Sequence, residues 1–496
     1  NGLVNPDRGP HPAMAEVKYV HQNVGFDAID AASGKFNITN RFYFTNLKKY
    51  QIHYSVLANG KTVKSGKVSL DIAPQASKEF TVPVNGLKAR PGTEYFVNFS
   101  VIAVEPEPLI PAGYEIAYDQ FRLPVEAERN TYKANGPALQ TQTQGDELTV
   151  SSSKVNFVFN KKSGLVTSYK VDGTEYFKDG FGIQPNFWRA PNDNDYGNGA
   201  PKRLHVWKQS SKDFHVTDTK VSTEDKAVLL QATYLLAAGN LYVVTYKIYP
   251  SGIVHVNAKF TSTDMQAAET EVSEATRMAT FTPGSDAARK AASKLEVPRI
   301  GVRFRLPAQM NNVQYFGRGP EENYIDRNHG TMVGIYQTTA DKMYFNYVRP
   351  QENGHHTDTR WLNLSPDKGN GLVIVADSLI GFNALRNSVE DFDSEEALPH
   401  PYQWNNFSPE EATNHDEKAA RNVLRRMHHV NDITPRDFVE VCVDMKQQGV
   451  GGYDSWGARP EPFHQIPANR EYNWGFTLVP VRSGSQATEA TKYDYR

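Results

Sequence analysis

Short runs of β-prone residues separated by turn residues fill most of this 496-residue chain, and this pattern excludes a helical or α/β fold. The pattern is densest between positions 148 and 482, where one such run follows another almost without interruption. Examples are 155–159, 228–234, 241–249 and 253–260. The one helical piece that we expect in this region lies near 286–294. Strands without intervening helices predict a single large β-sandwich.

A second series of short strands precedes this region. The run 51–57 leads into Asn59 and Gly60, a dipeptide typical of a two-residue hairpin turn. The other runs expected to be strands here are 36–44, 67–70, 79–84 and 94–102. Several short strands without helices between them favour an immunoglobulin-like sandwich.

These patterns divide the chain into five parts. We expect a connector over 1–15, the immunoglobulin-like β-sandwich over 16–123 and a polar linker over 124–147. The large sandwich then covers 148–482, and a frayed polar tail covers 483–496. The fold class predicted for the chain is therefore all-β.

Composition excludes several classes of partner. A net charge of −2 and a pI near 6.8 give no electrostatic reason to expect nucleic acid or an anionic membrane. No stretch of about 18 apolar residues predicts a transmembrane helix. The single cysteine, Cys442, cannot form an intrachain disulfide, and its β-like surroundings predict a buried inert thiol. One cysteine is compatible with either the cytoplasm or the periplasm of a bacterium.

The beginning of the chain suggests a part of something longer. It starts at Asn1 without an initiator methionine, a basic stretch or an apolar stretch of the kind that signal peptides carry. We therefore expect an interior or C-terminal piece of a larger protein.

The segment 187–199, which reads FWRAPNDNDYGNG, is the most distinctive motif. Asn, Asp and Gly favour turns, because their side chains bond the nearby backbone or permit positive φ angles. We expect a surface loop, too polar to belong to the core, that shapes one face of the large sandwich.

Two later segments combine acids, amides, arginines and aromatics. They are 315–327 (YFGRGPEENYIDR) and 347–354 (YVRPQENG). Such a mixture is typical of a loop that faces a sugar or an interface. The alternative is a structural scaffold in which Glu322, Asp326 and Arg327 pair with one another.

The last motif, 449–456, reads GVGGYDSW and ends at Trp456. Glycines ahead of a tryptophan allow the backbone to bend and present the indole face. The apolar face of a sugar stacks well on such a ring, although a tryptophan in a β-protein is more often part of the core. The flanking Gly, Asp and Ser residues favour exposure of Trp456.

Taken in order, these motifs resemble the C-terminal part of the large bacterial β-galactosidases of glycoside hydrolase family 2. The resemblance begins with Asn1 and its neighbours, with 7–8 and with 10–13, and continues with 70–75, which reads LDIAPQ. It ends with the four segments 187–199, 319–327, 347–354 and 451–456, and so covers nearly the whole chain.

The resemblance implies an immunoglobulin-like β-sandwich followed by the β-galactosidase small-chain domain, a supersandwich similar to galactose mutarotases. It implies that the full-length enzyme is a hydrolase that removes terminal β-D-galactosyl residues with retention, as in lactose catabolism. One glutamate acts as acid and another as nucleophile in that chemistry. Both are expected in a barrel that precedes this chain, so no catalytic residue is expected here and the chain alone should be inactive.

The resemblance also implies site residues and partners. Trp456 corresponds to a substrate platform, and Asn1 corresponds to an asparagine at the galactose and sodium site. Magnesium and sodium are expected for the full-length enzyme, with no cofactor belonging to this part alone. The expected partners are the β-galactoside, the enzyme's own N-terminal catalytic barrel and further copies in a homo-oligomer.

Two other functions remain open at this point. The sandwich could be a stand-alone carbohydrate-binding module that uses Trp456. It could also be an enzyme resembling aldose 1-epimerases, which needs a carboxylate base and a histidine acid in one cleft. Glu352 with His355 or His356 supplies the obvious candidates for that pair.

Overall fold

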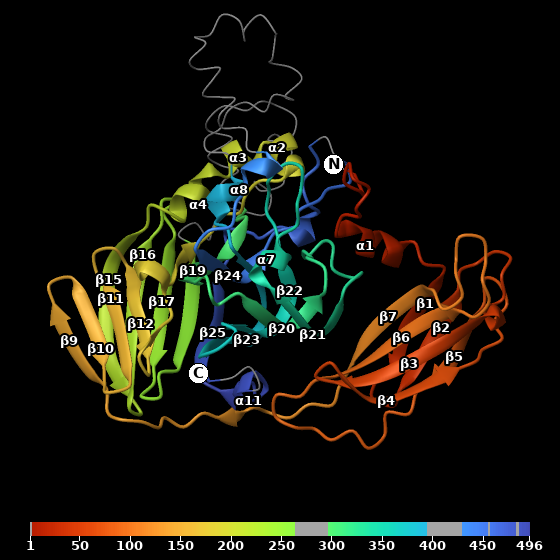
Figure 1. The fold of residues 1–496 in the computed structure, drawn as a ribbon, viewed down its shortest axis with the longest axis horizontal. Coiled ribbons are helices and arrows are strands. Elements are labelled where there is room, and N and C mark those ends of the chain that lie inside the picture. Colours follow the sequence, from red (N-terminus) through yellow and green to blue (C-terminus); the bar gives the residue numbers. More distant parts are fainter. Residues whose placement is uncertain (1, 263–295, 394–428, 455–456, 483–485) are drawn as a thin grey trace, which may run out of the picture.

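The structure, a computed structural model, describes residues 2–262, 296–393, 429–454, 457–482 and 486–496. Within these residues the fold is built from β-sheets with only short helices (Figure 1). The predicted all-β fold class, a smaller sandwich followed by a larger one, is confirmed. The helical piece expected near 286–294 lies outside the described residues.

The smaller sandwich consists of two antiparallel sheets. One has the order β1-β2-β5, and the other has the order β4-β3-β6-β7. Their bounds are β1 (Val24–Asp30), β2 (Lys35–Asn40), β3 (Tyr50–Ala58), β4 (Lys61–Val68), β5 (Ser77–Thr81), β6 (Tyr95–Ala103) and β7 (Glu115–Leu123). Asn59 and Gly60 form the β3–β4 turn at φ angles of 45° and 74°, as the hairpin signal predicted.

The core of this sandwich is aromatic. Phe99 lies at its centre with 0% exposure, and its ring centroid is 4.8 Å from that of Phe26 and 5.0 Å from that of Phe36. Phe80 and Phe121 complete the cluster. Alternation of buried and partly exposed residues along β2 and β6 places these side chains on the inner faces.

The residues ahead of this sandwich differ from expectation. The chain forms helix α1 (Ala13–Val20) where strands were expected from position 16 onward. The helix follows Pro12 and carries Glu16 in its first turn and Lys18 in its last, which suits the helix dipole. Glu16 accepts a hydrogen bond from the backbone NH of Gly330 at 2.7 Å, so α1 is anchored on the larger sandwich.

The larger sandwich is built on a 12-stranded sheet. Its main path runs β14-β19-β24-β23-β25-β18-β17-β16-β15, and β20, β21 and β22 join it through β23. The bounds are β14 (Gln184–Asn186), β15 (His215–Glu224), β16 (Ala227–Leu235), β17 (Leu241–Ile248), β18 (Val254–Thr261), β19 (Arg299–Pro307), β20 (Asn312–Gly319), β21 (Met332–Thr339), β22 (His356–Ser365), β23 (Gly371–Leu385), β24 (Phe438–Gln447) and β25 (Tyr472–Val481).

A five-stranded sheet packs against this large sheet. It comprises β9 (Gln140–Gln144), β10 (Glu147–Ser151), β11 (Val155–Asn160), β12 (Leu165–Val171) and β13 (Thr174–Glu175). A single apolar cluster joins the two sheets and includes Phe157 from β11, Tyr246 from β17 and Phe304 from β19. Cys442 lies in β24, where burial raises the pKa of its thiol, in keeping with an inert side chain.

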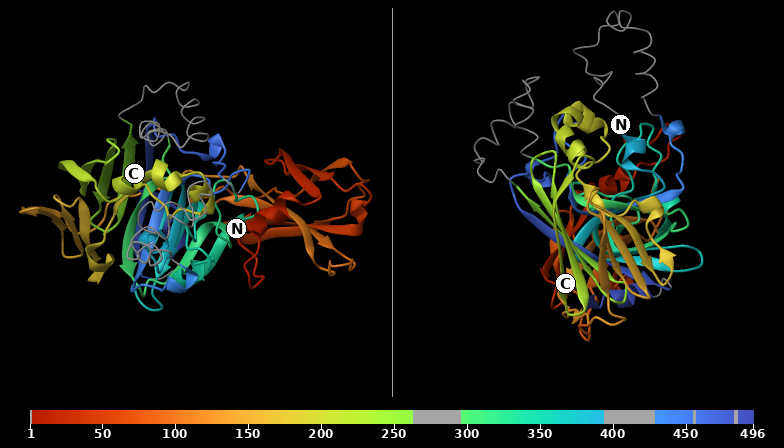
Figure 2. Two further views of the ribbon diagram at one scale, coloured as in Figure 1. Left: turned by 90° about the horizontal axis from the view of Figure 1, so that it is seen from above. Right: turned by 90° about the vertical axis from the view of Figure 1, so that its left-hand side faces the viewer.

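The linker over 124–147 and the last residues of the chain are paired. In Figures 1 and 2 the two sandwiches stand side by side, and the linker runs along one edge of the larger one. Its strand β8 (Asn130–Thr131) pairs in parallel with β26 (Tyr493–Asp494). Tyr495 is 4% exposed, and helix α11 (Ala487–Ala490) buries both of its alanines. The segment expected to be a frayed polar tail is therefore packed from position 486 onward.

Candidate substrate-facing pocket

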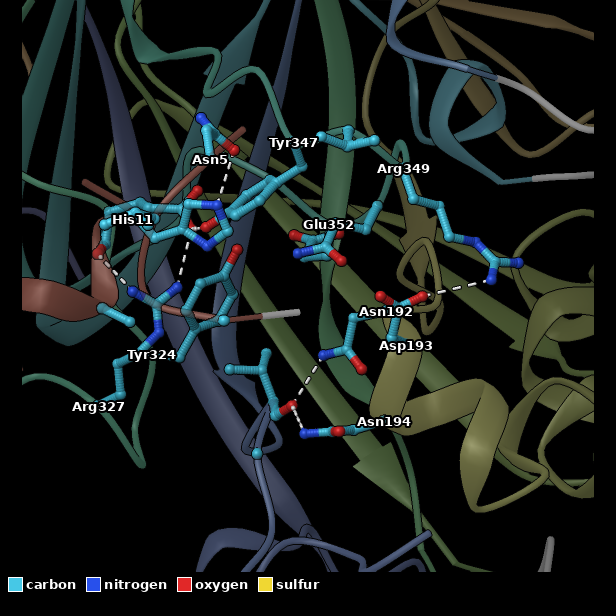
Figure 3. Close-up of a pocket in the computed structure, with 18 of the residues that line it drawn as sticks. Asn5, His11, Asn192, Asp193, Asn194, Tyr324, Arg327, Tyr347, Arg349 and Glu352 are labelled. Carbon is cyan, nitrogen blue, oxygen red and sulfur yellow. Dashed lines mark hydrogen bonds and ion pairs between the residues drawn. The ribbon is translucent and has the colours of Figure 1, made fainter. Parts of the chain in front are cut away.

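A pocket with a volume of about 670 Å³ lies where the larger sandwich meets the first residues of the chain (Figure 3). Its lining comes from segments far apart in sequence: Gly2, Val4, Asn5, Pro6, His11, Ala13, Asn192, Asp193, Asn194, Glu322, Tyr324, Arg327, Tyr347, Val348, Arg349, Gln351, Glu352, Val450 and Gly451. Four motifs selected from the sequence, together with the first 13 residues, thus converge on one cavity.

The segment 187–199 supports one wall, and the expectation of a surface loop is wrong for its first half. Residues 187–192 are buried, and Phe187 packs against Trp207, Tyr242 and Phe260. The buried position of Arg189 is tolerated because each nitrogen of its guanidinium has a hydrogen-bond partner. It contacts both oxygens of Asp195, at 3.2 and 2.8 Å, and donates to the backbone oxygens of Gln448 and Gly449 at 2.6 and 3.0 Å.

The middle of this segment, residues 192–194, lines the pocket. Asn192 caps helix α2 (Asp193–Gly197) and forms a capping box with Asp195. The Asn192 amide also donates to the backbone oxygen of Val450 at 2.8 Å, which fixes the segment 449–451 beside it. Asp193, at the start of the helix, pairs with Arg349 at 3.3 Å, as Figure 3 shows.

Glu322 forms the opposite wall and is fully engaged. One carboxylate oxygen accepts from Arg327 at 2.8 Å and from the Tyr347 hydroxyl, and the other accepts from the backbone NH of Gly354 at 2.6 Å. The pairing of Glu322 with Arg327 matches the scaffold interpretation. Asp326 does not join it, because its carboxylate accepts from the backbone NH of Gly451 at 2.8 Å.

Beneath the pocket lies a cluster of buried charges centred on Arg299. This arginine is 0% exposed, and its guanidinium lies 2.8 Å from Glu352 and 3.1 Å from Asp444. Two carboxylates share this cation. Burial raises the pKa of Asp444 to about 7 against the opposing effect of Arg299, and burial likewise raises the pKa of Glu352.

The two adjacent histidines do not face the pocket. His355 stacks on Tyr324 with ring centroids 5.4 Å apart, and burial holds its pKa well below the usual range. Burial lowers the pKa of His356 to about 4, and its Nδ1 lies 3.0 Å from the backbone oxygen of Arg318. Glu352 lines the pocket, but its carboxylate is held by Arg299. Among the described residues, Glu352 and the two histidines therefore do not form the acid–base pair that was considered for an epimerase.

The start of the chain closes the pocket from outside. The Nε2 of His11 lies 2.7 Å from the Asn5 side-chain oxygen, and its ring packs edge-on against Phe345 and Tyr347. Burial lowers the pKa of His11. Gly2 belongs to the lining, whereas Asn1 and Trp456, the two residues expected to touch substrate, lie outside the described residues.

The pocket is suited to binding polar, uncharged groups. Asp193, Glu322 and Glu352 are each paired with an arginine, so they present hydrogen-bond acceptors whose charge is balanced. The part of the chain that the structure describes contains no group of three or more His, Cys, Asp or Glu residues placed to hold a metal ion. Among the same residues, no helix is long and apolar enough to cross a membrane.

Sequence reasoning missed Arg299 and Asp444. Both stand in strands that otherwise read as apolar, RIGVRFRL and VEVCVD, and nothing in a single sequence says that their side chains point inward.

Comparison with known proteins agrees with this architecture. Residues 151–478 match the family model described as "Beta galactosidase small chain", and residues 36–124 match "Beta-galactosidase, domain 4". A β-galactosidase of Priestia megaterium is 32% identical over 484 residues, which are 97% of this chain and 41% of that protein. A β-galactosidase of Streptococcus thermophilus is 26% identical over 487 residues, 97% of this chain and 40% of that protein.

A solved structure of galactose 1-epimerase from Lactobacillus acidophilus NCFM covers 71% of this chain and 99% of its own, with 9% identity and a TM-score of 0.30. The chain spans about two fifths of the length of the curated relatives that it matches. With two thirds of its residues inside one family model, the chain belongs to the β-galactosidase small-chain family.

Proposed function

We propose that this chain is the C-terminal, non-catalytic part of a retaining β-galactosidase of glycoside hydrolase family 2. It contributes one wall of the substrate site and braces the catalytic barrel. The observation that carries the proposal is the pocket itself. Residues 2–13, the part expected to follow the barrel, and the four motifs of the larger sandwich line a single polar cavity.

The state of the pocket carboxylates supports a binding role. Retaining hydrolysis needs one protonated carboxylic acid and one free carboxylate on either side of the glycosidic bond. Glu322 is held by Arg327, Tyr347 and a backbone NH, and Glu352 is held by Arg299 and Asn383. Neither is free to attack or to protonate, so the two catalytic glutamates belong to the rest of the enzyme.

The exposed apolar residues around the pocket support a partner on this face. Leu3, Val4 and Val348 are 47%, 49% and 54% exposed, and two of them line the pocket. Apolar side chains gathered at a polar rim are typical of an interface. In this proposal the partner is the catalytic barrel of the same enzyme. The assembled enzyme forms a homo-oligomer.

Two residues complete the site in this proposal. Trp456 follows the pocket residue Gly451 closely in sequence and serves as the platform for the galactosyl ring. Asn1 directly precedes the pocket residue Gly2 and supplies a side-chain oxygen to sodium. The magnesium ligands belong to the rest of the enzyme.

The proposal is tested by assembly. The purified chain is assayed on a chromogenic β-galactoside, alone and after co-expression with the remaining N-terminal part of the Priestia megaterium relative. We expect no turnover alone and heat-labile turnover after assembly. Turnover by the chain alone that survives mock-purification controls would overturn the non-catalytic role.

Trp456→Ala sharpens the test. In the assembled enzyme it should raise KM by roughly tenfold, which corresponds to about 1.4 kcal/mol of lost binding. Trp474→Phe is the matched control, because Trp474 lies in β25 and packs on Phe476. Equal effects of the two substitutions would contradict the platform role.

A further inference from the structure

A second cavity, of about 480 Å³, lies at the start of β20, whereas the substrate-facing pocket lies beyond its end. Most of its lining residues have polar side chains: Asn312, Val313, Gln314, Gln337, Thr338, Asn363, Ser365, Pro366, Asp367, Gly369, Gly371 and Arg482. It shares no lining residue with the first pocket. None of the motifs selected from the sequence contributes to it.

The floor of this cavity is a row of amides in register. Gln314 in β20 lies directly opposite Gln337 in β21 and directly opposite Asn363 in β22. Residues opposite one another on adjacent strands point to the same face. Asn312 and Ser365, also directly opposite each other, form the next polar row on that face. The strands thus present amide groups about 5 Å apart in a line.

One member of this row lacks a partner. Asn363 is 3% exposed, and its side-chain oxygen has no hydrogen-bond partner among the described residues. A buried polar atom without a partner is costly, and a water molecule, an ion or a ligand bound there would account for it. Gly371 keeps this place open, because a Cβ on it would lie 3.1 Å from that oxygen. The same burial makes Asn363 inaccessible as a glycosylation acceptor, although 363–365 has that sequence pattern.

The charges at the rim balance each other. Asp367 accepts from the Asn312 amide at 2.9 Å, and Arg482 lies 3.8 Å from Asp172. Among the lining residues these are the only two that carry a formal charge, and their signs are opposite. The cavity therefore offers donors and acceptors without a net field, which favours a neutral ligand over an ion.

We propose that this cavity is a second saccharide site, separate from the substrate-facing pocket. A primary amide both donates and accepts, and so does a sugar hydroxyl. A row of amides across three strands can therefore bond successive hydroxyls of one neutral mono- or disaccharide. The orphan oxygen of Asn363 accepts from one hydroxyl, and Gln314 and Gln337 bond its neighbours.

The test observes the side-chain amides directly. The ¹⁵N-labelled chain is titrated with lactose, and the NH₂ signals of Gln314 and Gln337 are assigned by their loss in Gln314→Ala and Gln337→Ala. We expect both signals to shift and to saturate with a Kd on the order of 1 mM. The double variant should weaken calorimetric binding by about tenfold. Gln231→Ala, in β16 of the same sheet, should leave it unchanged.

Three results would overturn the proposal. The first is the absence of any shift, in which case water alone satisfies Asn363. The second is an equal shift with glycerol at the same hydroxyl concentration. The third is a shift confined to Gln351, which lines the first pocket and reports binding there. Because the readouts are separate, this site can fail while the proposed role of the first pocket stands.

Discussion

The interiors of the two sandwiches are stabilised by different interactions. In the immunoglobulin-like sandwich the central contacts join phenylalanine rings, with Phe99 in contact with Phe26, Phe36 and Phe80. Beneath the pocket of the larger sandwich, Arg299 lies between Glu352 and Asp444 with no exposure to solvent. Apolar packing contributes stability that depends little on pH. Buried ion pairs contribute less net stability, because desolvation opposes them, but they fix the geometry of the groups around them.

Removal of an aromatic ring tests the first half of this comparison. Phe99→Ala should cost about 4 kcal/mol, because it deletes a fully buried ring and leaves a cavity. No tryptophan lies within 16–123, so tryptophan fluorescence reports only the larger sandwich. We expect the far-UV circular dichroism transition in urea to split, with the fluorescence transition unchanged. A fluorescence midpoint that falls equally would show that the two interiors unfold as one unit.

Removal of the central cation tests the second half. Arg299→Met should cost about 3 kcal/mol, because it leaves Glu352 and Asp444 buried without compensation. Proton uptake by Asp444 keeps this cost at the low end of the range expected when one partner of a buried ion pair is removed. Here the fluorescence transition should move, since the Arg299 guanidinium also donates to the backbone oxygen of Trp188 at 3.2 Å.

The matched control for this substitution is Arg496→Met, which breaks an exposed pair with Asp494 outside the smaller sandwich. Its cost should stay below about 1 kcal/mol. Equal costs for the two arginines would remove the distinction between buried and exposed pairs.

The pH dependence of stability separates the two interiors further. The pKa of Asp444 is about 7 in the folded chain and about 3.9 in an unfolded one. Between these values the folded state keeps a proton that the unfolded state has released, so the free energy of unfolding falls as the pH rises from about 4 to about 7. Asp444→Asn should abolish this contribution. From pH 5 to pH 8 the wild type should lose about 2 kcal/mol more than the variant does.

His355 affects the same interval in the opposite sense. Its depressed pKa makes stability fall as the pH drops below about 6.5. His355 Nδ1 lies 3.7 Å from Asp444, so the difference between the two proteins reports Asp444 together with this contact. Asp218→Asn, on the exposed strand β15, is the control, and an equal change in its pH slope would refute the assignment.

The smallest effect concerns the pocket wall. Tyr347→Phe removes one donor to Glu322 and leaves Arg327 and the backbone NH of Gly354 in place. We expect a loss of about 1 kcal/mol in urea denaturation. Tyr344→Phe, whose hydroxyl makes a 3.4 Å contact with Asn346, should cost less. A larger cost for Tyr344→Phe would show that the Glu322 network adds little.

Much of the fold could be predicted because a strand is marked locally by a run of β-prone residues between turn residues. The runs 51–57, 155–159 and 228–234 lie inside β3, β11 and β16, and the run 94–102 matches β6 to within one residue at each end. The run 36–44 was too long, since β2 ends at Asn40 and the chain then turns. Helix α1 was missed because its eight residues contain no buried position and so show no apolar face.

The pocket could be predicted only in part, for a similar reason. The motifs identified segments that line the pocket, since turn-forming and mixed polar residues are typical of loops that carry function. Whether Asp195 faces solvent or Arg189 depends on a partner six positions away, and whether Asp326 meets Arg327 or Gly451 depends on a loop 125 positions later. Such pairings depend on the tertiary structure and cannot be predicted from the composition of the segment. The positions of Asn1 and Trp456 relative to the pocket stay predictions.

The parallel pair of β8 and β26 bears on how the two sandwiches act together. If only an unpaired polar linker joined the two sandwiches, they could change their relative orientation. The effective concentration of one near the other would then depend on the length of the linker. Here the strand 493–494 holds the linker at 130–131, with the rings of Tyr132 and Tyr495 4.9 Å apart. The last residues of the chain thus fix the position of the linker. Deleting 486–496 would free the linker, while the hydrogen bonds of Tyr118 with Gly330 and of Gln120 with Val333 would still join the two sandwiches.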